Sequence, residues 1–202
     1  SNRQIIASAK VMSDYLGGNR RPFLILDEDP LVTRSVEISA RAAATRGFLI
    51  LSSKSEYFLV QNNNQLLLNI DKFRKSLTHY ENGNQEMCIF GFTFILYHHV
   101  VKVLKENGIC FTLPKNSKVA HIGGWKKLES QKVTKEKFLS DVTSIFGVKE
   151  ENIYDFYGFT EQMGLVYVSV GCSPKTVPAY SEIIIRDFQT LKPVKDGEQG
   201  LI

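Results

Sequence analysis

The stretch PFLIL at residues 22–26 is a short, unbroken apolar run. Such a run is typical of a strand that other layers cover on both faces, as in a parallel sheet. MCIFGF (87–92), KVAHIGG (118–124) and NIYDFYG (152–158) have the same character. Helical patterns separate these runs, and strands that alternate with helices predict a layered α/β fold with a mostly parallel sheet flanked by helices.

The remaining elements follow from apolar periodicity. Further strands are expected over residues 48–51 and 56–60, with a loop at 62–64. Residues 164–171 and 181–188 alternate without a helix between them, which predicts a more antiparallel C-terminal part. Helices are expected over residues 4–16, 32–45, 70–80, 93–108 and 134–147. We find no internal repeat, low-complexity tract or long linker, so a single α/β domain over residues 1–202 is expected.

Composition excludes several classes of protein. The chain is 43% hydrophobic and 23% charged, as is ordinary for a soluble globular protein. Its net charge is +4, from 25 basic and 21 acidic residues, and it has no dense Lys/Arg block of the kind that binds nucleic acid. Apolar runs stay well short of the roughly 18 residues of a transmembrane segment.

The N-terminal residues and the cysteines bear on location. SNRQIIASAK (1–10) lacks the apolar core of a signal peptide. The three cysteines, Cys88, Cys110 and Cys172, are far apart and form no CxxC motif. A disulfide framework or a zinc site is therefore not expected, and a cytoplasmic location fits this cysteine usage.

Two predicted strands end in residues that are suited to binding a ligand. HIGGWKKLE (121–129) places Gly123 and Gly124 after a strand, followed by Trp125, the only tryptophan. Two glycines allow the backbone to approach a flat ligand closely. The alternative is a tight turn beside a core tryptophan, and the spacing alone favours this alternative.

The second strand end is FYGFTEQ (156–162). Tyr157 is able to stack on a base, Thr160 to hydrogen-bond a phosphate oxygen, and Glu161 to hold Mg²⁺, a cation that prefers carboxylates beside phosphates. The alternative is again the plain end of a strand. Ligands of open α/β sheets bind outside the carboxyl ends of strands. Both motifs occupy such positions, about one helix apart, as a nucleotide site requires.

These residues carry a resemblance. YGFTE resembles the Tyr-Gly-x-Thr-Glu motif of the adenylate-forming superfamily of acyl-CoA synthetases and luciferases. The chain more closely resembles the acyl-protein synthetase (LuxE) family of bacterial luminescence operons, in FGFTF (90–94), HIGGWKKLE, FYGFTEQMG (156–164) and IIIRDFQTLKPVKDGEQGLI (183–202). The matches follow one another in order over most of the chain.

The resemblance implies an AMP-forming ligase that uses ATP and Mg²⁺. A fatty or related carboxylic acid is converted to acyl-AMP, and the acyl group passes to a thiol and then to a partner protein. It also implies site residues: Tyr157 and Gly158 pack on adenine, Gly123, Gly124 and Trp125 line the pocket, Thr160 contacts the phosphates as a catalytic residue, and Glu161 is catalytic and binds the metal.

The chain departs from the superfamily pattern in three respects. The Ser/Thr/Gly-rich phosphate loop, the ribose-binding Gly-Asp motif and the C-terminal lid do not occur in it. A partial adenylation domain over residues 1–202 is therefore expected. The acceptor cysteine of the family lies near its C-terminus, so Cys172 does not inherit that role.

Two other functions remain open. A ligase of the phenylacetate type would use coenzyme A as the acceptor, and a non-catalytic module would only bind an acyl or nucleotide ligand. Among the histidines, the neighbours His98 and His99 point about 100° apart on a predicted helix, so packed or boundary positions are favoured over a metal site. His121 precedes the double glycine, and a place in the pocket is open to it but is not the favoured interpretation.

Overall fold

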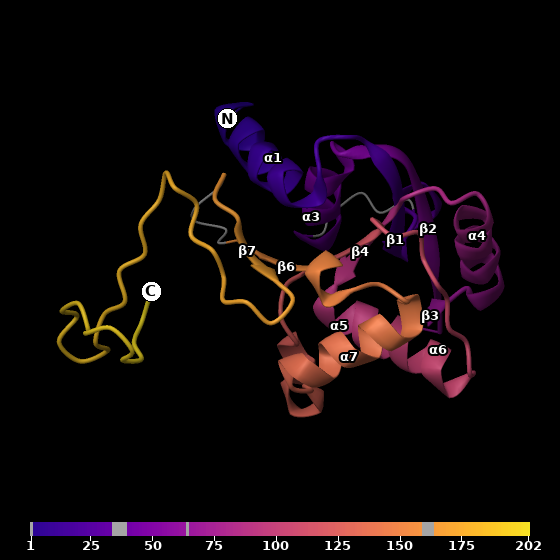
Figure 1. Cartoon of the computed structure of the whole chain (residues 1–202). Helices are drawn as coiled ribbons and strands as arrows, with labels where there is room; N and C mark the ends of the chain where they lie inside the picture. The colour runs from indigo at the N-terminus through magenta and orange to yellow at the C-terminus, as the bar shows by residue number, and fades with distance from the viewer. Residues whose placement is uncertain (1, 34–39, 64, 159–163) are drawn as a thin grey trace.

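The structure, a computed structural model, describes residues 2–33, 40–63, 65–158 and 164–202. Its centre is a seven-stranded sheet in which the inner ladders are parallel and the two edge ladders antiparallel (Figure 1). In spatial order the strands are β3 (Gln65–Leu68), β2 (Ser52–Asn62), β1 (Arg21–Glu28), β4 (Cys88–Phe92), β5 (Lys118–Ile122), β6 (Ile153–Tyr157) and β7 (Tyr167–Val170). This confirms the expected fold class and its antiparallel C-terminal part.

Strand β1 is buried on both faces, as its apolar run predicts. Leu24 and Leu26 face one hydrophobic cluster, while Phe23 and Ile25 face another on the opposite side. All four side chains are at most 1% exposed. Side chains of one strand thus hold both layers of helices to the sheet.

Helices cover both faces. α1 (Asn2–Leu16) and α3 (Ala40–Leu49) contribute Met12, Leu16 and Phe48 to one cluster. The opposite face carries α4 (Ile70–Asn82), α7 (Lys135–Phe146) and the helix that follows β4. The short helices α2 (Pro30–Thr33), η2 (Lys126–Gln131) and η3 (Glu150–Asn152) complete the described elements. No described helix is long and apolar enough to cross a bilayer.

The helix after β4 confirms the one expected over residues 93–108, but it is irregular. It consists of α5 (Thr93–Ile95), a π-helical turn η1 (Leu96–Val101) and α6 (Lys102–Glu106). His99 hydrogen-bonds the Leu66 carbonyl through Nδ1 at 2.8 Å, and the His98 ring packs against Trp125. Both histidines are therefore packing residues at the edge of the core.

Three expectations need correction or addition. Residues 48–51 are not a strand, because Phe48 is the inward side chain of α3 and packs on Phe90 and Phe156. Part of the helix expected over 32–45 lies at residues 34–39, outside the described residues. Strand β3 was not expected. It pairs antiparallel with β2, which it follows directly after the predicted loop.

Residues 181–188 were expected to form a strand, and this is wrong for the part of the chain that the structure describes. Only Arg186 makes isolated bridges, to Pro193 and to Leu201. Ile184 and Phe188 remain exposed. An alternating pattern indicates a strand only where a neighbouring strand satisfies the backbone, and this segment lies away from the sheet in Figure 1.

Hydrogen bonds to Asp141 join α7 to the irregular helix that follows β4. The buried Asp141 carboxylate accepts hydrogen bonds from Tyr97 at 2.7 Å, Lys105 at 2.7 Å and Lys137 at 3.0 Å. Burial raises the pKa of Asp141, but the bonds from Lys105, Tyr97 and Lys137 outweigh burial and lower the pKa to about 2.

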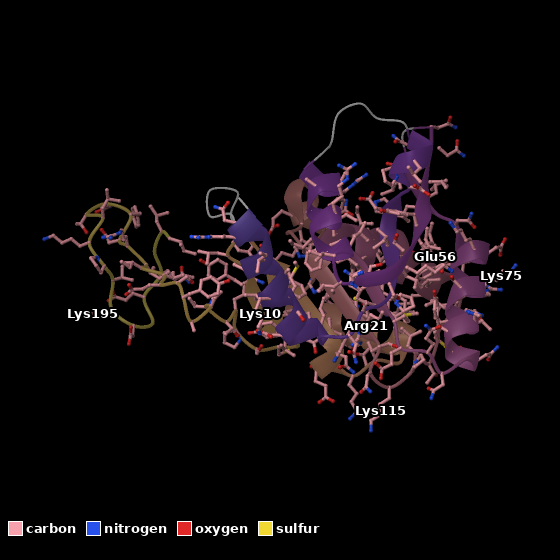
Figure 2. All side chains as sticks on the ribbon, turned by 90° about the horizontal axis from the view of Figure 1, so that it is seen from above. Lys10, Arg21, Glu56, Lys75, Lys115 and Lys195 are labelled. Carbon is pink, nitrogen blue, oxygen red and sulfur yellow. The ribbon has the colours of Figure 1, made fainter. Side chains whose placement is uncertain are left out.

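We expect Asp141→Asn to lower the free energy of unfolding by about 1–3 kcal/mol at pH 7, because a neutral amide replaces a charged acceptor. Urea denaturation measures the difference. Asp14→Asn is the matched control, since Asp14 pairs with Lys10 on the exposed face of α1 (Figure 2), and this change should alter stability by under about 0.5 kcal/mol.

The pH dependence adds a second check. A carboxylate with a depressed pKa stabilises the fold above its unfolded pKa and loses that effect as the pH falls through the folded value. The gap between wild type and Asp141→Asn should therefore close from about pH 4 to about pH 2. A stability gap that is constant down to pH 2 would show that hydrogen bonds to the ionised Asp141 do not stabilise the fold.

Candidate functional site

A cavity of about 300 Å³ lies where β5 and β6 end, beside the first half of α7. Its size is at the lower end of the range for small-molecule sites. Gly123, Gly124, Trp125 and Tyr157 line it, so the structure brings four of the sequence-predicted residues around one space. The carboxyl ends of parallel strands are where open α/β sheets bind ligands.

The Gly123–Gly124 turn requires its first glycine. Gly123 has φ +78°, and a Cβ at this position would lie 3.2 Å from the Phe92 ring. A side chain is disfavoured there by both conformation and space. Gly124 is exposed and has open space around it, so a ligand can approach its backbone closely.

Trp125 serves the core and the cavity together. Its indole is 8% exposed and packs edge-on against the rings of Tyr97 and Phe138. The same side chain lines the cavity. The two interpretations of this tryptophan, core residue and pocket wall, are therefore compatible.

Tyr157 ends β6 with a ring that is 39% exposed, and the Lys175 ammonium lies 5.9 Å from the centre of this ring. Gly158 follows it and is exposed. Thr160 and Glu161 lie outside the described residues, so their predicted roles in phosphate and metal binding stay predictions.

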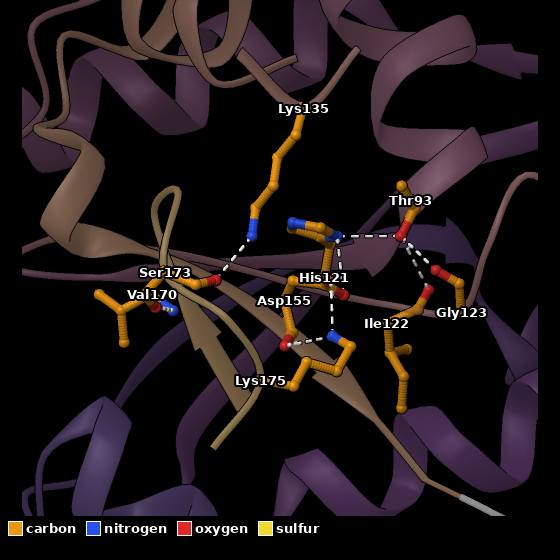
Figure 3. Close-up of polar contacts among 9 residues, drawn as sticks. All are labelled: Thr93, His121, Ile122, Gly123, Lys135, Asp155, Val170, Ser173 and Lys175. Carbon is orange, nitrogen blue, oxygen red and sulfur yellow. Dashed lines mark hydrogen bonds and ion pairs between the residues drawn. The ribbon is translucent and has the colours of Figure 1, made fainter. Parts of the chain in front are cut away.

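A buried polar group lies below the glycine turn (Figure 3). The Thr93 hydroxyl is 2.9 Å from Nδ1 of His121 and 2.5 Å from the Gly123 carbonyl oxygen. Asp155 places Oδ1 3.7 Å from the same nitrogen, and its Oδ2 accepts a hydrogen bond from Lys175 at 2.7 Å. Three neighbouring strand ends are thus joined through side chains.

The loop after β7 forms one wall of the cavity. Lys135, in the first turn of α7, donates to the Ser173 carbonyl at 2.8 Å, and Ser173 Oγ accepts from the Val170 amide at 2.9 Å. Figure 3 shows Lys135 reaching across to Ser173 on the opposite side. Two lysines, Lys135 and Lys175, therefore hold this loop while lining the cavity.

His121 is a neutral member of the group. Burial lowers its pKa to about 4, the Asp155 carboxylate opposes this shift, and the ammonium groups of Lys175 and Lys135 add to it. At neutral pH the imidazole therefore contributes hydrogen bonds and no charge.

The described residues form no cluster of metal-binding side chains. They contain no group of three or more His, Cys, Asp and Glu side chains able to hold a metal. Asp155 lines the cavity, but Lys175 already neutralises its carboxylate. The expectation of Mg²⁺ thus rests on Glu161 alone.

Sequence reasoning missed Thr93, Asp155 and the two lysines. Thr93 stands within FGFTF (90–94), where the signal was a hydroxyl directly after a buried strand. Asp155 was concealed inside an apolar strand. Lys175 had no local signal, because its loop reaches the site only through the β6–β7 pairing.

The comparison with protein families decides the class. The family model described as acyl-protein synthetase, LuxE, matches residues 1–202. The chain belongs to the acyl-protein synthetase (LuxE) family. The resemblance seen in the GGW and YGFTE motifs is thereby confirmed.

One related protein and one solved structure are similar to the chain. The chain is 29% identical, over 149 residues, to a long-chain-fatty-acid–luciferin-component ligase from Aliivibrio fischeri. The match covers 72% of this chain and 37% of that relative, so the chain spans well under half of its length. The chain also superposes on an ATP-bound RpMatB-BxBclM chimera with a TM-score of 0.59 at 12% identity, covering 99% of this chain and 34% of the chimera. The second likeness shows a shared fold.

The neutral state of His121 generates a prediction. Between about pH 6.5 and about pH 4 the unfolded chain binds a proton at this histidine that the folded chain does not bind, so stability falls as the pH falls through this window. The loss should be on the order of 3 kcal/mol in wild type and should be absent in His121→Asn.

Urea denaturation at several pH values between 7 and 4 measures this difference. His79→Asn, a change at an exposed histidine, is the control and should leave the wild-type profile in place. Parallel stability profiles for wild type and His121→Asn would show that His121 is not held neutral by its surroundings.

Proposed function

We propose that residues 1–202 form part of an adenylation domain of an ATP-dependent acyl-protein synthetase. One observation carries the proposal: the Gly123–Gly124 turn and Tyr157 line a single cavity at the ends of neighbouring strands. Membership of the LuxE family supplies the chemistry to be expected there. The missing upstream phosphate loop and C-terminal lid belong, in this proposal, to the rest of a longer protein.

The proposed reaction has two steps. An oxygen of a fatty carboxylate attacks the α-phosphorus of ATP, and the bond to pyrophosphate breaks to give acyl-AMP. A protein thiol then attacks the acyl carbon, loses its proton and releases AMP. The name of the Aliivibrio fischeri relative supports a long-chain fatty acid as substrate, and the ATP bound in the structural neighbour supports the nucleotide.

The residues of the cavity have distinct parts in this scheme. The exposed ring of Tyr157 stacks on the adenine, and the side-chain-free backbone of Gly123 and Gly124 packs against the opposite face. Trp125 and Phe138 supply apolar walls that exclude water. Holding the reactants in place and stabilising developing charge are the main contributions a protein makes to such a transfer.

The residues that we assign to the phosphates of ATP come from the sequence motif alone. We assign Thr160 to contact with the phosphates and Glu161 to Mg²⁺, which would neutralise phosphate charge when bound. An acyl-accepting partner protein completes the scheme. Three free cysteines, of which Cys110 and Cys172 are exposed, support a reducing compartment such as the cytoplasm.

Tyr157→Ala should weaken binding of a non-hydrolysable acyl-AMP mimic by about 1–3 kcal/mol, the range for stacking of a base on an aromatic ring. Isothermal titration calorimetry measures the change. Phe188→Ala removes an aromatic residue that is 67% exposed and does not line the cavity, and this variant should bind like wild type. Equal affinities for wild type and Tyr157→Ala would remove this tyrosine from the nucleotide site.

Glu161→Ala should abolish ATP–pyrophosphate exchange driven by a fatty acid in the intact protein, because the proposed metal ligand is lost. Melting temperature checks that the variant is folded. Glu151→Ala, at an exposed position, is the control and should retain exchange. Exchange at the wild-type rate in Glu161→Ala would refute the metal-binding role.

The acceptor is tested separately. The intact protein, given ATP and a radiolabelled fatty acid, should acquire acyl label that hydroxylamine releases, as a protein thioester requires. Label found on coenzyme A instead, with none on protein, would reassign the chain to the acyl-CoA ligases.

A further inference from the structure

We propose that Thr93 is a positioning residue that fixes the peptide plane between Gly123 and Gly124, so that the Gly124 amide is presented to the bound ligand. This inference rests on the proposed function, because it takes the glycine turn as the surface on which the nucleotide lies. The first part of the proposal, that the Gly123–Gly124 peptide is held in one orientation, can be tested without any ligand.

The contacts of the Thr93 hydroxyl carry the inference. Thr93 is the first residue of α5, directly after β4, and it is buried beside the turn. Its Oγ1 donates to the Gly123 carbonyl at 2.5 Å and lies 3.4 Å from the Ile122 carbonyl. Figure 3 shows both carbonyls turned towards this one hydroxyl.

The Thr93 hydroxyl determines the direction of its contact with His121. A hydroxyl has a single hydrogen, and the short contact with the Gly123 carbonyl uses it. The 2.9 Å contact with His121 then requires Nδ1 to donate its hydrogen to Oγ1. The relay therefore runs from His121 through Thr93 to the Gly123 carbonyl.

The geometry of the peptide bond gives the consequence. In a trans peptide the carbonyl and the following amide point in opposite directions. No described peptide bond is cis. Since Thr93 holds the Gly123 carbonyl inwards, the Gly124 N–H points away from Thr93, at a residue that is exposed and lines the cavity.

A steric contact supports the same turn. The Phe92 ring lies 3.2 Å from where a Cβ of Gly123 would be, so the residue before Thr93 closes the space beside the turn. Glycine itself has no preference for one peptide orientation, and two in succession would flip readily without a fixed partner. Thr93 therefore supplies the constraint that two glycines lack.

The test compares three variants with wild type. Thr93→Val removes the hydroxyl at nearly constant volume, and Thr93→Ser restores it. Thr143→Val is the matched control: within the part of the chain that the structure describes, the buried Thr143 hydroxyl has no hydrogen-bond partner. Melting temperatures confirm that each variant is folded.

The first measurement is the ¹⁵N backbone order parameter of Gly124 in the ligand-free chain. It should fall from about 0.85, the value of rigid backbone, to below about 0.6 in Thr93→Val, and stay high in Thr93→Ser and Thr143→Val. The second is the dissociation constant of 5′-O-(N-dodecanoylsulfamoyl)adenosine by calorimetry. It should rise about tenfold in Thr93→Val and less than about twofold in the other two variants, as the loss of one hydrogen bond implies.

The outcomes separate the two proposals. An unchanged Gly124 order parameter in Thr93→Val overturns the fixed peptide, whatever the ligand does. A fall in the order parameter with unchanged affinity overturns the positioning role, and so does a Thr93→Ser variant that binds as weakly as Thr93→Val. An intact wild-type protein that has a rigid turn but does not bind the probe supports the fixed peptide and refutes the proposed nucleotide site.

Discussion

Close contact between the central strands β1 and β4 is the constraint on which the sheet depends. Gly91 of β4 lies opposite Leu26 of β1, and a Cβ on Gly91 would lie 2.8 Å from the Leu26 Cβ. Because both strands are buried on both faces, neither backbone has water as an alternative partner, and the ladder must satisfy it. On its other side β4 pairs with β5, which pairs with β6, so Thr93 at the end of β4 lies in the same group of strand ends as His121 and Asp155.

The cavity combines apolar walls with charges that are mostly compensated. Asp155 shares its carboxylate with Lys175 and lies near a histidine that stays neutral. Lys135 is engaged with a backbone carbonyl. Such a lining favours recognition through shape, stacking and a few directed hydrogen bonds, which accords with the aromatic base of the proposed function better than with an isolated small ion.

The sequence predicted what depends on local pattern. Apolar runs located the buried strands, and the double glycine and the Tyr-Gly motif located the cavity, because both features follow directly from strand ends. Pattern failed where long-range contacts decided the structure. Phe48 belongs to a helix because rings from β4 and β6 meet it, and residues 181–188 alternate without a strand to pair with. Thr93 and Asp155 have meaning only once three strands stand side by side, and no spacing along the chain reveals that.

The mixture of edge and inner pairings has a consequence for how the chain folds. Strands β2 and β3 pair from Asn62 and Gln65 onwards, and Asn63 has a positive φ of 46° in the connection. Such a local hairpin forms on a timescale of about 1–10 μs. By contrast, β1 can join β4 only after the chain has closed a long loop that contains β2, β3 and α4. Closing this long loop costs more chain entropy than closing the hairpin, so we expect the central parallel pair to form after the hairpin, and the cavity, which needs β4, β5 and β6 together, to form later still.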